Sequence, residues 1–523
     1  MDANSGKFGT LRAFLWPIHR FEYRKFIPMI VMFFLISFNY NLLRAIKDSF
    51  IVTANNSGAE ALPFIKLWAI LPMAFLMTYI FTKLSNRFSR EKVFYILMGA
   101  FLSFFLLFAF VLYPYREALH PNEFADKLEL FLPKGFHGLI AVIRNWTLSA
   151  FYVMSELWGV VILTVLFWGF ANEVTKVGEA KRFYSLFAIG ANASGIISGQ
   201  SAIKLSSNLF NPNLPFGQTA WDQSVVYLNC TIVLTGIIVM TIYRWFNKKV
   251  IGQEAPIKDQ IKKEPKIKLS MRKNFAYLAR SKYLIYIALI VLTYNITINL
   301  VEVLWKSQLK ELYPNPSDYS IYMGQVMTWM GIMATFIAIF ISGNVIRRFS
   351  WTLSALITPL IVLFTGIVFF SFLVFKGSVL TPIAAFFGST PLILSVFFGS
   401  MQNCLCRACK YTLFDATKEL AFVPLGKEGK LKGKAAIDGV GSRIGKCGGA
   451  VIYQALLLMF GTLSLSTPYI FAIFLVIVSI WVFSVTSLGK KFQELTSTDE
   501  KSVVVEKPLE ATIKSSQSKE AVS

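Results

Sequence analysis

The chain has 523 residues, of which 55% are hydrophobic and only 15% are charged, and its formal net charge is +23. Soluble domains carry about a quarter charged residues, whereas this chain has long apolar runs and a mean hydropathy of +0.56. The composition excludes an ordinary soluble domain, and the length of the runs excludes a β-barrel, whose strands alternate over roughly ten residues. We therefore expect an all-α polytopic membrane protein.

Twelve apolar stretches are long enough to cross a bilayer, which takes about 20 residues of helix. They begin near Ile27, Pro63, Val93, Asn145, Arg182, Val225, Tyr283, Tyr322, Trp351, Leu392, Ile437 and Pro468. A further apolar piece at 138–143 is short, and the sequence leaves open whether it spans.

The loops between these stretches alternate in charge. One set, including 87–92 and 244–282, is rich in Lys and Arg, and the other, including 53–62 and 114–135, is poor in both for its length. Because cytoplasmic loops carry the Lys and Arg excess, this alternation predicts both termini in the cytoplasm. It also explains the net charge without a nucleic-acid partner. No signal or transit peptide is evident, which favours a bacterial inner (cytoplasmic) membrane.

The spans divide evenly around a polar, Lys-rich segment. The predicted units are a cytoplasmic segment 1–26, a six-helix bundle 27–246, a basic cytoplasmic linker 247–282, a second six-helix bundle 283–489 and a disordered cytoplasmic tail 490–523. Two six-helix halves repeated in parallel are the plan of major-facilitator-type transporters, which bind substrate between the halves near the midplane.

The two halves also share short motifs. Tyr40 and Asn41 in the first span match Tyr294 and Asn295 in the seventh. These four polar side chains are candidates for lining a cavity between the halves.

Four ionisable residues stand out inside the apolar runs. They are Lys47, Glu156, Glu302 and Lys446, in the first, fourth, seventh and eleventh spans. Such groups are costly in hydrocarbon, and they tend to face a bundle interior and to mark a substrate or ion path. Each of the two lysines has an arginine three residues before it, Arg44 before Lys47 and Arg443 before Lys446. Lys47 is also followed directly by an acidic residue, Asp48.

Two basic pairs from opposite halves are suited to a polyphosphate, because Arg offers paired donors and Lys a point charge. Glu156 and Glu302 would then neutralise the empty site, act in gating, or carry a proton. The alternatives are buried structural pairs, for instance Lys47 with Glu302, and anchoring of helix ends at the lipid headgroups. Arg407 and Lys410 in the tenth span are further candidates for the basic lining.

Other chemistry finds little support. Cys404, Cys406 and Cys409 lie in an apolar run with no histidine nearby, so we expect packing rather than a metal site or cofactor. The stretch 441–447 resembles a phosphate-binding loop, but its glycine spacing is one short and a cysteine replaces the Ser or Thr. No hydrolysis motif remains, so a bound nucleotide would be cargo and the protein no enzyme.

At several stretches the chain resembles the ATP/ADP translocases, the nucleotide transporter family of obligate intracellular bacteria and plastids. The resemblance covers nearly the whole chain and rests on 39–48, 58–68, 155–159, 167–173, 179–184, 305–310 and 432–438. It implies exchange of external (host) ATP for internal ADP plus phosphate. It also implies that Lys47, Glu156, Glu302 and Lys446 correspond to the family's important charged residues.

One departure concerns the substrate. Exchangers of this family tend to read Leu-Arg-Asp-Thr-Lys-Asp in the first span, where this chain has Ala45 and Ile46 in place of the Asp and Thr. The family also contains proton-driven importers of other nucleotides (GTP, UTP, CTP) and a dinucleotide (NAD) exchanger, which remain the alternatives. We expect a functional monomer.

Overall fold

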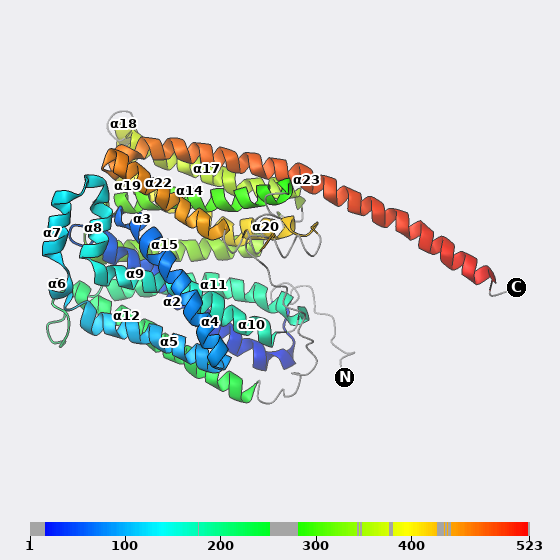
Figure 1. Cartoon of the computed structure of the whole chain (residues 1–523), viewed down its shortest axis with the longest axis horizontal. Helices are drawn as coiled ribbons and strands as arrows, with labels where there is room; N and C mark the ends of the chain where they lie inside the picture. Colours follow the sequence, from blue (N-terminus) through cyan, green and yellow to red (C-terminus); the bar gives the residue numbers. More distant parts are fainter. Residues whose placement is uncertain are drawn as a thin grey trace.

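A computed structural model describes residues 16–175, 177–250, 281–342, 345, 348–375, 380–425, 433, 434, 437 and 441–520. Over these residues the protein consists of helices and the loops that join them, and it has no strand (Figure 1). Helix α2 begins, and α23 leaves the bundle, at one end, called here the terminal end. Helices α7, α8 and α18 lie at the opposite end, called the distal end.

The spans of the first half follow the predicted order. They are α2 (Tyr23–Val52), α3 (Ala61–Phe64) continued by η2 (Ile65–Ile70) and α4 (Leu71–Arg87), α5 (Arg90–Leu107) with η3 (Phe108–Leu112), α9 (Trp146–Trp158) with η5 (Gly159–Phe167) and α10 (Trp168–Val174), α11 (Val177–Ser206) and α12 (Ala220–Lys249).

The second half repeats this plan. Its spans are α14 (Lys282–Leu312), α15 (Pro316–Phe336) with η7 (Ile337–Ser342), α17 (Trp351–Val374), α19 (Pro391–Cys409) with η8 (Lys410–Phe414) and α20 (Asp415–Ala421), α22 (Ser442–Phe460) and α23 (Leu463–Glu520). Within the described residues, ten spans have the length and hydropathy to cross a membrane. With α11 and α22, whose sequences are richer in glycine and polar residues, they account for the twelve predicted spans.

The piece at 138–143 does not span. It belongs to α8 (His137–Arg144), which has eight residues and is preceded by η4 (Lys134–Phe136). At 1.5 Å per residue this helix is about 12 Å long, against about 30 Å of hydrocarbon. With α6 (Arg116–Leu119) and α7 (Asn122–Phe131) it forms a distal cap on the first half.

The structure describes the three polar segments outside the bundle to different extents. Most of the linker 247–282 and of the segment 1–26 lies outside the described residues. The tail, expected to be disordered, continues as helix to Glu520 and projects away from the bundle (Figure 1). A helix pairs its own backbone polar groups, so it requires no packing partner to satisfy them.

Small residues join the two halves along α11 and α15. A Cβ built on Gly199 would lie 2.5 Å from the carbonyl oxygen of Gly324, and one on Gly331 would lie 2.9 Å from the carbonyl oxygen of Asn192. Nearer the distal end, the hydroxyls of Ser206 and Ser320 are 3.0 Å apart. Such close backbone approach depends on glycine, so these positions set the distance between the halves.

We expect Gly199→Ala to lower the melting temperature of the detergent-purified protein, because its methyl group displaces α15. Overpacking of this kind costs about 1–3 kcal/mol. Gly99→Ala is the matched control, since a Cβ at Gly99 meets nothing within 4 Å. Equal melting temperatures for the two variants would show that α11 and α15 do not need this contact.

Candidate functional site

A cavity of about 280 Å³ lies between the two halves. It is called here the central cavity. Its walls include η2, α2, α9, α14, α19, η8 and α22, so both halves contribute. Its lining residues are Tyr40, Arg44, Lys47, Lys66, Ile70, Leu71, Ala74, Tyr152, Glu156, Val160, Tyr294, Asn295, Ile298, Asn299, Glu302, Arg407, Lys410, Tyr411, Lys446 and Cys447. Ten of the thirteen residues predicted for the site are among them.

The other three predicted residues lie elsewhere. Asp48 is buried behind the cavity wall, in a separate space of about 20 Å³. The side chain of Asn41 turns to α11, where its amide donates to Ser194 Oγ at 3.0 Å. Arg443 lies in α22, but its side chain is outside the described part of the structure.

The cavity is strongly positive. Its lining contains six basic side chains and two acidic ones, Glu156 and Glu302. Both carboxylates are already held by lysine or arginine. Among the described residues, Arg44, Lys410 and Lys446 have no carboxylate within ion-pair distance. The geometry therefore leaves three cations available to an anion that enters.

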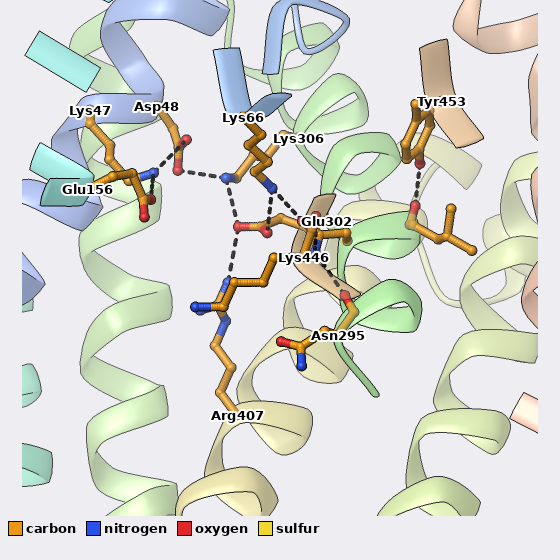
Figure 2. A network of polar contacts seen from close by, with 12 residues as sticks. Lys47, Asp48, Lys66, Glu156, Asn295, Glu302, Lys306, Arg407, Lys446 and Tyr453 are labelled. Carbon is orange, nitrogen blue, oxygen red and sulfur yellow. Dashed lines mark hydrogen bonds and ion pairs between the residues drawn. The ribbon is translucent and has the colours of Figure 1, made fainter. Parts of the chain in front are cut away.

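The first-half acid forms a compact pair. Lys47 Nζ lies 2.7 Å from Glu156 Oε1 and 3.8 Å from the centre of the Tyr152 ring. The expected alternative pairing of Lys47 with Glu302 is not seen, because Glu302 lies across the cavity among other cations (Figure 2). Tyr152 was not predicted, and its role is to hold the ammonium through the face of its ring.

The second-half acid is shared by three cations. Glu302 Oε1 accepts from Lys306 at 2.8 Å and from Arg407 at 3.0 Å, and Oε2 lies 3.3 Å from Lys66 Nζ (Figure 2). Lys306 also reaches Asp48 Oδ2 at 2.8 Å. Because Lys66 and Asp48 belong to the first half, these two ion pairs connect the halves across the distal wall of the cavity.

Local features of the sequence place the lining. Gly159 makes room for Tyr40, since a Cβ there would lie 2.7 Å from the Tyr40 ring. Gly445 and Gly449 let α22 approach α14, since a Cβ on either would lie within 3.0 Å of the Cβ of Asn295 or of Asn299. The small residues of α22 thus bring Lys446 alongside the seventh span.

Three of the lining segments are π-helical. These are η2, η5 and η8, which hold Lys66, Val160 and Lys410. Single π turns within α-helices occur frequently at functional sites, because they shift the side chains that follow. The apolar periodicity of the sequence gave no indication of them.

Lys66 and Lys306 are the main residues that the sequence reasoning missed. Both lie inside apolar spans, so the criterion that selected Lys47 and Lys446 applies to them as well. Lys306 also follows Glu302 by four residues, a spacing that brings side chains together on a helix.

The cross-half polar contacts gather on one side of the cavity. Within the described residues they involve η2, the distal parts of α2, α14 and α22, and the facing stretches of α11 and α15 from the Gln200–Thr328 contact to the Ser206–Ser320 contact. Examples are Lys310, which donates to the carbonyl oxygen of Ser57, and Gln454, which donates to the carbonyl oxygen of Pro63 at 3.1 Å. The two halves are therefore closed together at the distal end.

A distal ion pair supports this closure. His137 Nδ1 lies 3.2 Å from Glu60 Oε1 and ties α8 to the start of α3. The hydrogen bond to Glu60 raises the pKa of His137 above its ordinary value, against the opposing effect of burial. Burial acts to raise the pKa of Glu60, but hydrogen bonds from His137 and from its own backbone outweigh it, and the pKa of Glu60 is lowered.

Two six-helix halves with a charged cavity between them form a membrane bundle with a major-facilitator-type fold. Solved structures agree on the fold. The nucleoside transporter NupG is 12% identical, with 90% of this chain and 99% of that chain covered and a TM-score of 0.50. A D-xylose-proton symporter is 11% identical, with 89% and 97% covered and a TM-score of 0.52.

Sequence comparison identifies the branch. A family model described as TLC ATP/ADP transporter matches residues 1–492. "ADP,ATP carrier protein 1" of Chlamydia pneumoniae is 48% identical over 503 residues, which cover 95% of this chain and 97% of the carrier. The chloroplastic "ADP,ATP carrier protein 1" of Arabidopsis thaliana is 44% identical, with 91% and 75% covered. The chain belongs to the TLC ATP/ADP transporter family, whose members are transporters and not enzymes.

We expect Lys306→Met to destabilise the protein by about 3–5 kcal/mol, because it leaves the buried carboxylate of Asp48 without its closest cation. Thermal unfolding in detergent measures the change. Lys434→Met is the control, since Lys434 and its partner Glu419 are half exposed and such a pair contributes at most about 1 kcal/mol. In the double variant Asp48→Asn/Lys306→Met the loss should be smaller than in Lys306→Met alone. A single variant as stable as the wild type would contradict the pairing.

The Glu60–His137 pair predicts a pH dependence of stability. Because the pKa of His137 is raised in the folded protein, its contribution is complete below about pH 6.5 and is lost as pH rises through the raised value. The melting temperature of wild type should exceed that of His137→Gln at about pH 6, and the difference should shrink by about pH 8.5.

His120 provides the matched control with the opposite sign. Its ring nitrogen contacts Thr147 Oγ1 at 2.7 Å, and burial lowers its pKa. The stabilisation lost in His120→Gln should therefore be largest above about pH 6.5 and shrink as the pH falls. The same pH trend in both variants would exclude the Glu60–His137 pair as its source.

Proposed function

We propose that the protein exchanges external ATP for internal ADP plus phosphate by alternating access in a bacterial inner membrane, as a monomer with both termini in the cytoplasm. The observation that carries the proposal is the positive central cavity, with Arg44, Lys410 and Lys446 free of carboxylate partners in the described structure. ATP carries about four negative charges at neutral pH. The lining, with six basic and two acidic side chains, offers an equal excess of positive charge.

The same balance favours phosphate as a companion of ADP. ADP has one negative charge fewer than ATP, so it leaves part of the cavity's positive charge uncompensated. In a low dielectric an uncompensated charge is costly, and a phosphate monoanion restores the balance. The names of the relatives support ATP and ADP as the nucleotides, since those proteins are called ADP,ATP carriers.

The two residues of the first span that differ from typical exchangers of the family lie in the packed interior and not in the cavity lining. Ala45 and Ile46, which replace the Asp and Thr typical of exchangers, are fully buried and do not belong to the lining. The neighbouring Arg44 and Lys47 do line the cavity. The substitution therefore leaves the proposed phosphate contacts of α2 in place.

The positions of the other predicted residues suggest their roles. Lys446, Arg44 and Lys410 bind phosphate oxygens, together with Lys47 once it leaves Glu156. Glu156 and Glu302 neutralise the empty site. With the termini in the cytoplasm, closure at the distal end corresponds to an inward-facing state.

Transport by proteoliposomes tests the exchange. Labelled ATP should enter vesicles loaded with ADP, enter faster when phosphate is added inside, and stay outside empty vesicles. A protonophore should have no effect. Uptake into empty vesicles that a protonophore abolishes would instead identify a proton-coupled importer. Competition by GTP, UTP, CTP or NAD stronger than by ATP would reassign the nucleotide.

We expect Lys446→Ala to lower the exchange rate by about 10–100-fold at limiting ATP, because one hydrogen bond to a charged group contributes about 1.5–3 kcal/mol. Lys446→Arg should retain more activity, since it keeps the charge. The control is Lys490→Ala, which removes an exposed lysine of the same half, in α23. Near-wild-type exchange by a well-inserted Lys446→Ala protein would remove Lys446 from the site.

A further inference from the structure

Lys66 occupies two positions at once, in the wall of the cavity and in the contact between the halves. Its ammonium lies 2.6 Å from Asn299 Oδ1 and 3.3 Å from Glu302 Oε2, both on α14 of the second half. Its side chain is only 17% exposed, and it is carried by η2 of the first half. Lys66 lines the central cavity beside Lys446 and Arg407.

We propose that Lys66 is a phosphate-operated latch: the phosphate chain of the nucleotide and Glu302 compete for its ammonium, and binding of phosphate releases the two halves at the distal end. The inference rests on the proposed function, because it takes the phosphate chain of a nucleotide as the competitor. It assigns a role to Lys66, which is neither one of the four ionisable residues nor a member of the two basic pairs predicted from the sequence.

The competition follows from the charges around Glu302. In the empty protein its carboxylate is shared by Lys66, Lys306 and Arg407. Lys66 and Arg407 face the cavity, whereas Lys306 is almost completely buried. A phosphate group that enters therefore attracts Lys66 and Arg407 but cannot reach Lys306. Glu302 is left with Lys306 as its remaining partner.

The effect extends to the second ion pair between the halves. Lys306 is divided between Asp48 of the first half and Glu302 of its own half, at 2.8 Å each. When Glu302 loses two cations, its attraction for Lys306 increases, and the bond from Lys306 to Asp48 weakens. One binding event thus loosens both cross-half pairs at the distal wall.

This latch gives a physical reason for strict exchange. Without an anion in the cavity, Lys66 and Lys306 hold the distal ends together, and the empty protein does not open outward. A ligand shifts such an equilibrium only through contacts that differ between the two states. Here the differing contact is the ammonium of Lys66, which bonds Glu302 in one state and phosphate in the other.

Hydrogen–deuterium exchange of the full chain in lipid nanodiscs tests the latch. Without ligand, Lys66→Gln should raise deuterium uptake at least about two-fold in the distal segments 57–66 and 300–312. In the wild type, ATP should raise uptake in the same segments, and adenosine, which has no phosphate, should not. In Lys66→Gln, ATP should add no further increase.

Two control variants distinguish loss of the latch from a general loss of structure. Lys66→Arg keeps the charge and should hold the distal segments closed without ligand. Lys204→Gln removes an exposed lysine near the distal end of α11 and should behave as the wild type. Unchanged distal uptake in ligand-free Lys66→Gln, or an equal effect of adenosine and ATP on the wild type, overturns the proposal.

Transport separates this inference from the proposed function. In Lys66→Gln, the ratio of ATP uptake with and without internal ADP should fall from above about ten towards one, because the empty protein reorients. If the wild type transports no nucleotide, the proposed function fails, while the ligand-free comparison still decides whether Lys66 latches the halves. A Lys66→Gln protein that exchanges as strictly as the wild type overturns the latch alone.

Discussion

Positive charge held inside an apolar bundle is the constraint on which the rest of this structure depends. An ammonium or guanidinium group away from water is costly unless a partner neutralises it. The central cavity holds more cations than carboxylates, so the empty protein satisfies some of them by sharing. Glu302 forms ion pairs with three cations, and Lys306 forms ion pairs with two carboxylates. This sharing links the charge balance of the cavity to the contact between the halves.

The helix packing makes that link geometrically possible. Glycines on α11, α15 and α22 allow the backbones of neighbouring helices to come into contact. Small residues therefore form the helix–helix contacts, whereas long polar side chains line the cavity. The π-helical segments η2 and η8 place Lys66 and Lys410 on the cavity wall within spans that are otherwise α-helical. The site thus combines rigid close packing with local irregularities that direct particular side chains.

Much of this architecture is predictable from the sequence, because hydrocarbon imposes strong rules. The length of apolar runs predicted the twelve spans, and the cost of buried charge selected Lys47, Glu156, Glu302 and Lys446, all of which reach one cavity. The partners of those residues were not predictable. Which carboxylate meets Lys47 depends on how α2, α9 and α14 cross, and the sequence pattern does not contain that information.

The directions of the Lys66 and Asn41 side chains depend on local structure that the sequence pattern does not show. Lys66 lies in a π-helical turn, so its direction cannot be deduced from an ideal helical period. Asn41 shows the converse, since it neighbours the lining residue Tyr40 yet bonds Ser194 of α11 instead. The sequence therefore indicates that a charged residue lies inside the bundle, but it does not indicate which neighbouring residues line the same cavity.

The two carboxylates of the cavity are best understood together with its free cations. If Glu156 and Glu302 were absent, every cation of the lining would lack a partner in the empty protein, and the halves would repel each other. If each cation had its own carboxylate, a phosphate chain would find none available. The observed balance lies between these limits, with two acids engaged and three cations unpaired in the described structure. A cavity of this kind keeps the two halves together at the distal end when it is empty and still attracts a polyanion, which is the combination that the proposed exchange requires.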